Sequence, residues 1–261
     1  MNFRQISRSL LCIVSLSILC LLGMSWFMPV QAATYGEANL NQNLTGKNLE
    51  TEVLKIIRSH PEVIIESFQI YQEQQKQQLE LTRQAFLQKL KTDPQIIIGD
   101  SPVIGSEEQK IVLLEFSDFQ CPFCARLHNT LKEFQEVHED EVKFVFKHLP
   151  IASIHPQAMS AAKAAWAAEQ QGKFWQYHDI LFEQQDKLGE ELYLDIAKGL
   201  DLDLEQFNRD RAGVVASATI AEDIQIAQAL GVQGTPFLVM NGEFISGAVP
   251  ISTLEEILQK N

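Results

Sequence analysis

Residues 111–124 read IVLLEFSDFQCPFC and decide the fold. A short apolar run bounded by polar residues predicts a buried β-strand over residues 110–117. Apolar residues then recur at helical spacing, which predicts a helix over residues 121–139. They are Leu127, Leu131 and Phe134. Cys121 and Cys124 therefore stand where a strand gives way to a helix, with the first cysteine at the helix N-terminus.

The position of Cys121 gives its sulfur a chemical role. Unpaired N–H groups at a helix N-terminus and the positive end of the helix dipole stabilise a thiolate relative to a thiol. Because the thiolate is the attacking form, Cys121 is predicted to be a nucleophile at neutral pH. Cys124 lies one turn deeper, where it can resolve a mixed disulfide on Cys121. Pro122 suits the first helical turn, which needs no N–H.

Other interpretations of the cysteine pair are weaker. Haem attachment needs a histidine directly after the second cysteine, where Ala125 stands. A structural bridge over so short a loop adds little stability. A zinc or copper site needs further ligands, and His128 is the nearest candidate. Metal capture by Cys121, Cys124 and His128 stays open as an alternative.

Downstream of this stretch the chain alternates strands and helices. Residues 142–148 alternate with period two and predict a second strand, which completes a βαβ unit. Residues 153–230 show helical patterns only. Two short strands and a closing helix follow over residues 237–240, 243–246 and 250–259. We expect His148 and His155, beside the second strand, to form only local hydrogen bonds. The predicted fold class is α/β.

The N-terminal residues predict export. Arg4 and Arg8 precede an apolar run over residues 10–30, which ends in small residues. A basic region, an apolar region and a cleavage site in this order are typical of a signal peptide. A run of this length also crosses a bilayer. We therefore expect residues 1–32 to be a signal peptide or a membrane anchor, and the protein to be periplasmic or to face an oxidising compartment from the membrane.

Charge and cysteine count exclude two classes of protein. The net charge of −13 and the sequence pI of about 4.9 argue against nucleic acid as a partner. Cys12 and Cys20 lie in the predicted leader, so the exported chain keeps Cys121 and Cys124 only. A disulfide-rich scaffold is therefore excluded.

Residues 33–104 are predicted to contain a linker and a helical segment. Residues 49–92 read as two helices, and the second has a middle, QEQQKQQ at residues 72–78, with no apolar residue. A helix with so small an apolar face is not stable alone. It must pack on the main domain or on another chain. A homo-oligomer formed through residues 49–92 is one such arrangement.

The region from 105 to 261 resembles the DsbA-like branch of the thioredoxin superfamily. The resemblance rests on EFSD at residues 115–118 before the CPFC motif, on GKFW at residues 172–175, and on Thr-Pro at residues 235–236. It implies a thioredoxin fold with an all-helical insertion over about residues 153–230, preceded by the N-terminal helical segment.

Several site roles are implied by this resemblance. Pro236 is expected to be cis, and Thr235 to lie beside Cys121 and pair with the extended backbone of a client. Glu115 is expected to relay protons to the deeper cysteine, with a pKa raised by burial. Phe123 stands where the best-known strong oxidant of the branch carries a histidine. We expect Phe123 to contact clients and the redox couple to be less oxidising.

The sequence thus predicts an exported thiol–disulfide oxidoreductase that forms disulfides in client proteins through Cys121 and Cys124. It needs no dissociable cofactor and no metal, and a membrane or soluble redox partner must restore its disulfide. One alternative is a disulfide isomerase or reductase on the same scaffold, which would need oligomerisation. The other is a copper- or zinc-capture protein.

Overall fold

The computed structural model describes residues 46–105 and 111–260. The predicted leader and most of the predicted linker lie outside these residues. The chain divides into two compact units, one ending at His60 and one beginning at Pro61. Within the described ranges, every helix is too short or too polar to cross a membrane.

The first unit contributes helix α1 (Gly46–Ser59) to the described residues. The apolar side chains of α1 are exposed, between 39% and 58% each. They are Leu49, Val53, Leu54, Ile56 and Ile57. This helix therefore carries apolar surface that its own unit does not bury.

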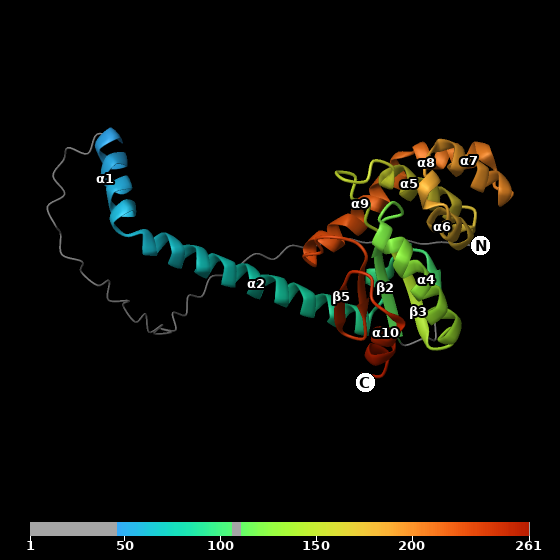
Figure 1. Cartoon of the computed structure of the whole chain (residues 1–261), viewed down its shortest axis with the longest axis horizontal. Helices are drawn as coiled ribbons and strands as arrows, with labels where there is room; N and C mark the ends of the chain where they lie inside the picture. Colours follow the sequence, from blue (N-terminus) through green and yellow to red (C-terminus); the bar gives the residue numbers. More distant parts are fainter. Residues whose placement is uncertain (1–45, 106–110, 261) are drawn as a thin grey trace, which may run out of the picture. The chain divides into compact units, whose positions relative to one another are not determined.

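The second unit is built on a mixed sheet in the order β1-β3-β2-β4-β5, with β2 (Ile111–Ser117) at its centre (Figure 1). The other strands are β1 (Val103–Ile104), β3 (Val142–His148), β4 (Phe237–Met240) and β5 (Glu243–Ser246). Strands β2 and β3 are parallel, and each remaining neighbouring pair is antiparallel. The predicted βαβ unit, hairpin and α/β class are confirmed.

Alternate residues of β2 face opposite sides of the sheet, because the side-chain period of a strand is two. Leu113 packs against α4 (Pro122–Val137) and α10 (Ile251–Leu258). Three other β2 residues, Val112, Leu114 and Phe116, enter the opposite core. That core is covered by the end of α2, by α3 (Gln95–Ile98) and by α9 (Val214–Ala229). Glu115 has the parity of Leu113 and lies on the α4 side.

Between β3 and β4 the chain forms the predicted helical insertion. Its elements are α5 (Ala158–Glu169), α6 (Phe174–Glu183), the 3₁₀ turn Gln185–Lys187, α7 (Glu190–Gly199), α8 (Leu204–Ala212) and α9. The buried alanines of α5 let neighbouring helices approach closely. The core of the insertion also includes Phe119, Cys121, Cys124 and Phe146. The insertion therefore packs directly on the cysteine loop.

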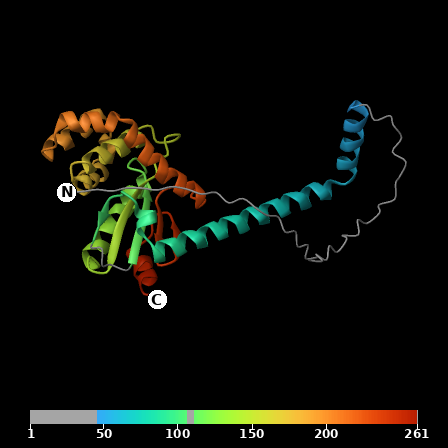
Figure 2. The same cartoon turned by 180° about the vertical axis from the view of Figure 1, so that it is seen from behind.

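Helix α2 (Pro61–Thr92) is docked at one end only. Near its C-terminus Phe86 is buried, and Arg83 Nε donates to the carbonyl oxygen of Leu230 at 3.0 Å. Figure 2 shows this end of α2 against the sheet. Towards its N-terminus Ile64 and Phe68 are more than half exposed. The C-terminal part of the segment thus packs on the main domain, which is one of the two arrangements that the sequence predicts.

The sheet begins earlier than the boundary at residue 105 that the sequence predicts. Strand β1 pairs with β3 through Val103 and Ile104, and α3 packs beneath the sheet just before it. Neither element is predicted from the sequence, because two strand residues and a single helical turn are too short to show a periodic pattern.

Candidate active site

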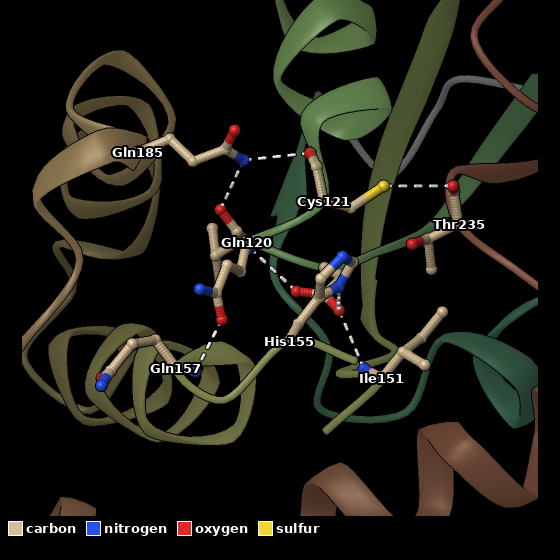
Figure 3. A network of polar contacts seen from close by, with 9 residues as sticks. Gln120, Cys121, Ile151, His155, Gln157, Gln185 and Thr235 are labelled. Atoms are coloured by element: carbon tan, nitrogen blue, oxygen red, sulfur yellow. Dashed lines mark hydrogen bonds and ion pairs between the residues drawn. The ribbon is translucent and has the colours of Figure 1, made fainter. Parts of the chain in front are cut away.

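The loop that follows β2 is held by the buried carboxylate of Asp118. This carboxylate accepts from the backbone N–H groups of Gln120 and Ile151, each at 2.8 Å, and lies 2.8 Å from Nδ1 of His155 (Figure 3). The expectation of purely local bonding is wrong for His155, which is 37 residues from Asp118. The Nε2 of His148 has no hydrogen-bond partner among the described residues, and only its backbone N–H donates to Asp223 Oδ2, at 2.8 Å.

Glutamine side chains join the helical insertion to the same loop. Gln185 Nε2 donates to the carbonyl oxygens of Phe119 at 2.8 Å and Cys121 at 3.0 Å. Gln120 Oε1 accepts from the backbone N–H of Gln157 at 2.6 Å. Figure 3 shows both contacts crossing from the insertion to the cysteine loop. No local pattern predicts them, because glutamine is common on helix surfaces.

Cys121 is the N-cap residue of α4, and Pro122 follows in the first turn, as predicted. The Cys121 Sγ lies 3.3 Å from the carbonyl oxygen of Thr235, to which it donates in its thiol form. A hydrogen bond from the Cys124 thiol is the main cause that lowers the pKa of Cys121 from 9.0 to about 5, and it outweighs the effect of burial. Backbone N–H groups of the first turn act in the same direction. Only 4% of Cys121 is exposed, so a client sulfur has a narrow line of approach.

Cys124 lies one turn deeper and is fully buried. Burial raises the pKa of the Cys124 thiol far above its usual range, and hydrogen bonding to Cys121 and the charge of Glu115 add to the rise. Both cysteines are free in the structure. The two thiols therefore differ sharply in acidity, with the negative charge placed on Cys121.

Glu115 lies on β2 beneath α4 and is 7% exposed. Burial is the larger effect and raises the pKa of its carboxyl from 4.5 to about 7, while the nearby Ser117 side chain acts in the opposite direction. Its Oε1 has no hydrogen-bond partner among the described residues. The expected burial and raised pKa are confirmed, while the relay role stays a prediction.

Thr235 and Pro236 form the loop beside the Cys121 sulfur, and Phe123 lies on the surface of the first turn of α4. The Thr235–Pro236 peptide bond is cis, as the resemblance implies. Pro236 is held by the Gly247 N–H, which donates to its carbonyl oxygen at 2.8 Å. Phe123 is 52% exposed, and the Arg126 guanidinium lies 5.4 Å from its ring centroid. Phe123 is therefore an exposed apolar surface in the first turn of α4, between the two cysteines.

The predicted metal-ligand set does not assemble. His128 is buried on α4, where it lies with His178 and Asp179 of α6 rather than with the two cysteines. His128 Nε2 is 3.9 Å from Asp179 Oδ1. The structure thus contradicts the alternative in which Cys121, Cys124 and His128 together capture zinc or copper.

A family model described as thioredoxin matches residues 98–260. Among curated proteins, the Na⁺/H⁺ antiporter NhaA 3 of Salinispora tropica is 38% identical over 152 residues, which is 58% of this chain and 23% of that protein. This chain thus spans about a quarter of the length of such relatives.

Two solved structures are similar over most of their own length. A thioredoxin-like oxidoreductase from Silicibacter pomeroyi DSS-3 is 32% identical, with a TM-score of 0.59, and the match covers 65% of this chain and 96% of that one. The thiol–disulfide exchange protein alpha-DsbA2 from Wolbachia pipientis is 24% identical, with a TM-score of 0.61, over 70% of this chain and 96% of that one. The second likeness bears on the fold alone.

Proposed function

Since the chain belongs to the thioredoxin family, which its match over residues 98–260 establishes, we propose that it is an exported thiol–disulfide oxidoreductase that forms disulfides in client proteins. The observation that carries this proposal is the asymmetry of the two thiols. Cys121 is the N-cap residue of α4 with a pKa of about 5, whereas burial raises the pKa of the Cys124 thiol far above its usual range.

This asymmetry favours oxidation of clients. A client thiolate attacks Cys121 Sγ in the Cys121–Cys124 disulfide, the S–S bond breaks, and Cys124 leaves and takes a proton from Glu115. A second client thiolate then attacks the client sulfur of the mixed disulfide, and Cys121 leaves as a thiolate. A thiol of low pKa is a good leaving group, and its stability as a thiolate favours the reduced enzyme. The client loses two electrons and two protons.

The cycle closes through a redox partner. The Cys121 thiolate attacks a disulfide of that partner, and Cys124 then attacks Cys121 while Glu115 takes its proton. A membrane or soluble protein with a more oxidising disulfide fits this role. We place the reaction in an oxidising compartment because residues 1–32 have the order of a signal peptide or anchor.

Clients are proposed to bind along the loop of the cis-proline. Thr235 and Pro236 offer backbone beside the Cys121 sulfur, where an extended client segment can pair with it. Phe123 adds an exposed apolar surface at the start of α4. Recognition of backbone and apolar surface suits an enzyme that accepts many unfolded clients.

The proposal is tested by equilibrating the purified protein with glutathione buffers and measuring its reduction potential. An oxidising potential, together with disulfide formation in a reduced client, is the expected result. The Cys121→Ser variant is expected to lose activity, and the Cys124→Ala variant to accumulate mixed disulfides with clients. A strongly reducing potential would contradict the oxidase and favour a reductase.

The exposed helices favour a second candidate, a disulfide isomerase working as a homo-oligomer through residues 49–92. The apolar side chains of α1 and the exposed half of α2 offer a contact surface for a second copy. Sedimentation of the mature protein decides between the two. A monomer would contradict the isomerase, whereas an oligomer that is lost on truncation before residue 79 would support it.

A further inference from the structure

Exchange at Cys124 moves a proton that has no direct way out of the protein. Cys124 is fully buried, and the acid proposed to take its proton, Glu115, is 7% exposed. Two buried groups can pass a proton between them, but in each cycle the proton must also reach solvent. The route between Glu115 and solvent is thus a necessary part of the reaction proposed above.

A cavity of about 270 Å³ connects Glu115 with the surface. It lies between α4, α6 and the sheet, and its volume is enough for several water molecules. Its inner wall includes Glu115, His128 and His178, and its outer wall includes exposed residues of α4. The titratable or charged residues that line it, apart from Glu115, are His128, Lys132, Glu136, Glu139, His178 and Asp179.

His178 is one of the buried polar groups of this wall. Its Nδ1 lies 2.9 Å from Asp179 Oδ1, and its Nε2 has no hydrogen-bond partner among the described residues. Asp179 is partly exposed, and its Oδ2 lies 3.5 Å from Lys132 Nζ at the surface. With Nδ1–H donating to Asp179, Nε2 is left as an acceptor. His178, Asp179 and Lys132 therefore form a line of polar groups that runs from the interior to solvent.

Besides Asp179, the polar group next to His178 is the imidazole of His128, whose ring centroid lies 5.2 Å away. Aromatic rings lie against His178 with centroids 4.9 to 5.7 Å away. They belong to Phe119, Phe146, Phe174, Trp175 and Phe182. Burial lowers the pKa of both His178 and His128, so both rings are neutral at pH 7 and each keeps an acceptor nitrogen. An unsatisfied buried nitrogen on a cavity wall is a ready site for an ordered water.

We propose that this cavity is the route by which protons pass between Glu115 and solvent, and that His178 is the positioning residue that holds its water chain in place. The proposal rests on the thiol–disulfide exchange proposed above. His178 forms no bond with client or cysteine. It acts through Glu115, which gives a proton to Cys124 when the disulfide opens and takes one when it closes.

His148 provides a matched control for substitution of His178. It is also buried, its Nε2 also lacks a hydrogen-bond partner among the described residues, and it packs against Phe119, Phe146 and Phe174. It does not line the cavity. Loss of either ring therefore disturbs the same aromatic core, but only His178→Leu interrupts the proposed route.

The test measures the rate at which Cys124 resolves a mixed disulfide between Cys121 and a small thiol, as a function of pH, in H₂O and in D₂O. His178→Leu is expected to slow this step about tenfold or more below the pKa of Glu115, with a larger isotope effect, because proton transfer becomes limiting. The pKa of Cys121, followed by thiolate absorbance, is expected to stay unchanged. His178→Gln, which keeps an acceptor, is expected to recover much of the rate.

A second variant keeps the test decisive if His178→Leu fails to fold. Asp179→Asn lies at the partly exposed end of the route and is expected to slow the same step several-fold. The inference is overturned if both variants keep the wild-type pH profile, or if His178→Leu slows resolution no more than His148→Leu does. A wild-type protein that performs no exchange at all overturns the proposed function, and this inference with it.

Discussion

Replacing Glu115 by glutamine is expected to stabilise the reduced protein at alkaline pH and to leave its stability almost unchanged near pH 4. Burial raises the pKa of Glu115 from 4.5 to about 7. A carboxyl whose pKa is higher in the folded state contributes stability that is complete below pH 4.5 and is lost as the pH rises through 7. Glutamine has the same shape and no proton to lose, so the variant avoids this loss.

The size of the effect follows from the raised pKa. A rise of about 2.5 units, at about 1.36 kcal/mol for each unit, corresponds to about 3 kcal/mol in the free energy of unfolding. Because the side chain is 7% exposed, solvent screening reduces this only slightly. With a typical urea m-value of about 1–3 kcal/mol/M, the urea midpoint of the variant should lie about 1–3 M higher at alkaline pH.

Urea unfolding of the reduced protein between about pH 4 and about pH 9 provides the assay. Glu133→Gln, on the exposed side of α4, is the matched control and is expected to leave the free energy of unfolding almost unchanged, because a surface substitution removes no buried contact. The reasoning is refuted if the stability difference between wild type and Glu115→Gln is constant with pH. It is equally refuted if the glutamine variant is the less stable protein at alkaline pH.

Three further predictions test the site. The ultraviolet absorbance of the reduced protein should show a thiolate with a midpoint near pH 5 that is absent from Cys121→Ser, and a midpoint near 9 would contradict the assigned asymmetry. Burial lowers the pKa of His148 to about 3, so the stability that its neutral ring contributes is fully present above about pH 6.5 and is lost as the pH falls towards 3. In acid unfolding curves, His148→Leu should therefore show a weaker dependence of stability on pH. An unchanged slope would be inconsistent with a neutral buried ring. Gln185→Ala removes two hydrogen bonds to the cysteine loop and should lower the free energy of urea unfolding by about 1–3 kcal/mol, whereas wild-type stability would show that these bonds contribute nothing net.

Local pattern was enough to predict the elements that carry the two thiols. The apolar run of β2, the helical spacing behind Cys121 and the period-two alternation of β3 each depend on neighbours in the sequence, so each is visible without a structure. The resemblance added the cis bond at Pro236 and the buried acid at Glu115. These are the parts of the site that the structure confirms in position.

The rest of the site depends on contacts between residues that are distant in sequence. Asp118 and His155 meet across 37 residues, and Gln185 reaches Cys121 across 64. His128 was assigned to the cysteines because it lies one turn after Cys124, but its ring points to α6. A side chain on a helix faces whatever packs there, and local spacing does not show which element that is.

The alternation of side chains along β2 decides on which side of the sheet the Glu115 carboxylate lies. Glu115 sits six positions before Cys121, and each step along the strand alternates between two separate cores. Sliding β2 by one position would turn the carboxylate into the opposite core and place Leu114 where Glu115 now lies. A change in the length of the loop that shifts β2 by one residue would therefore remove the buried acid while both thiols remained intact.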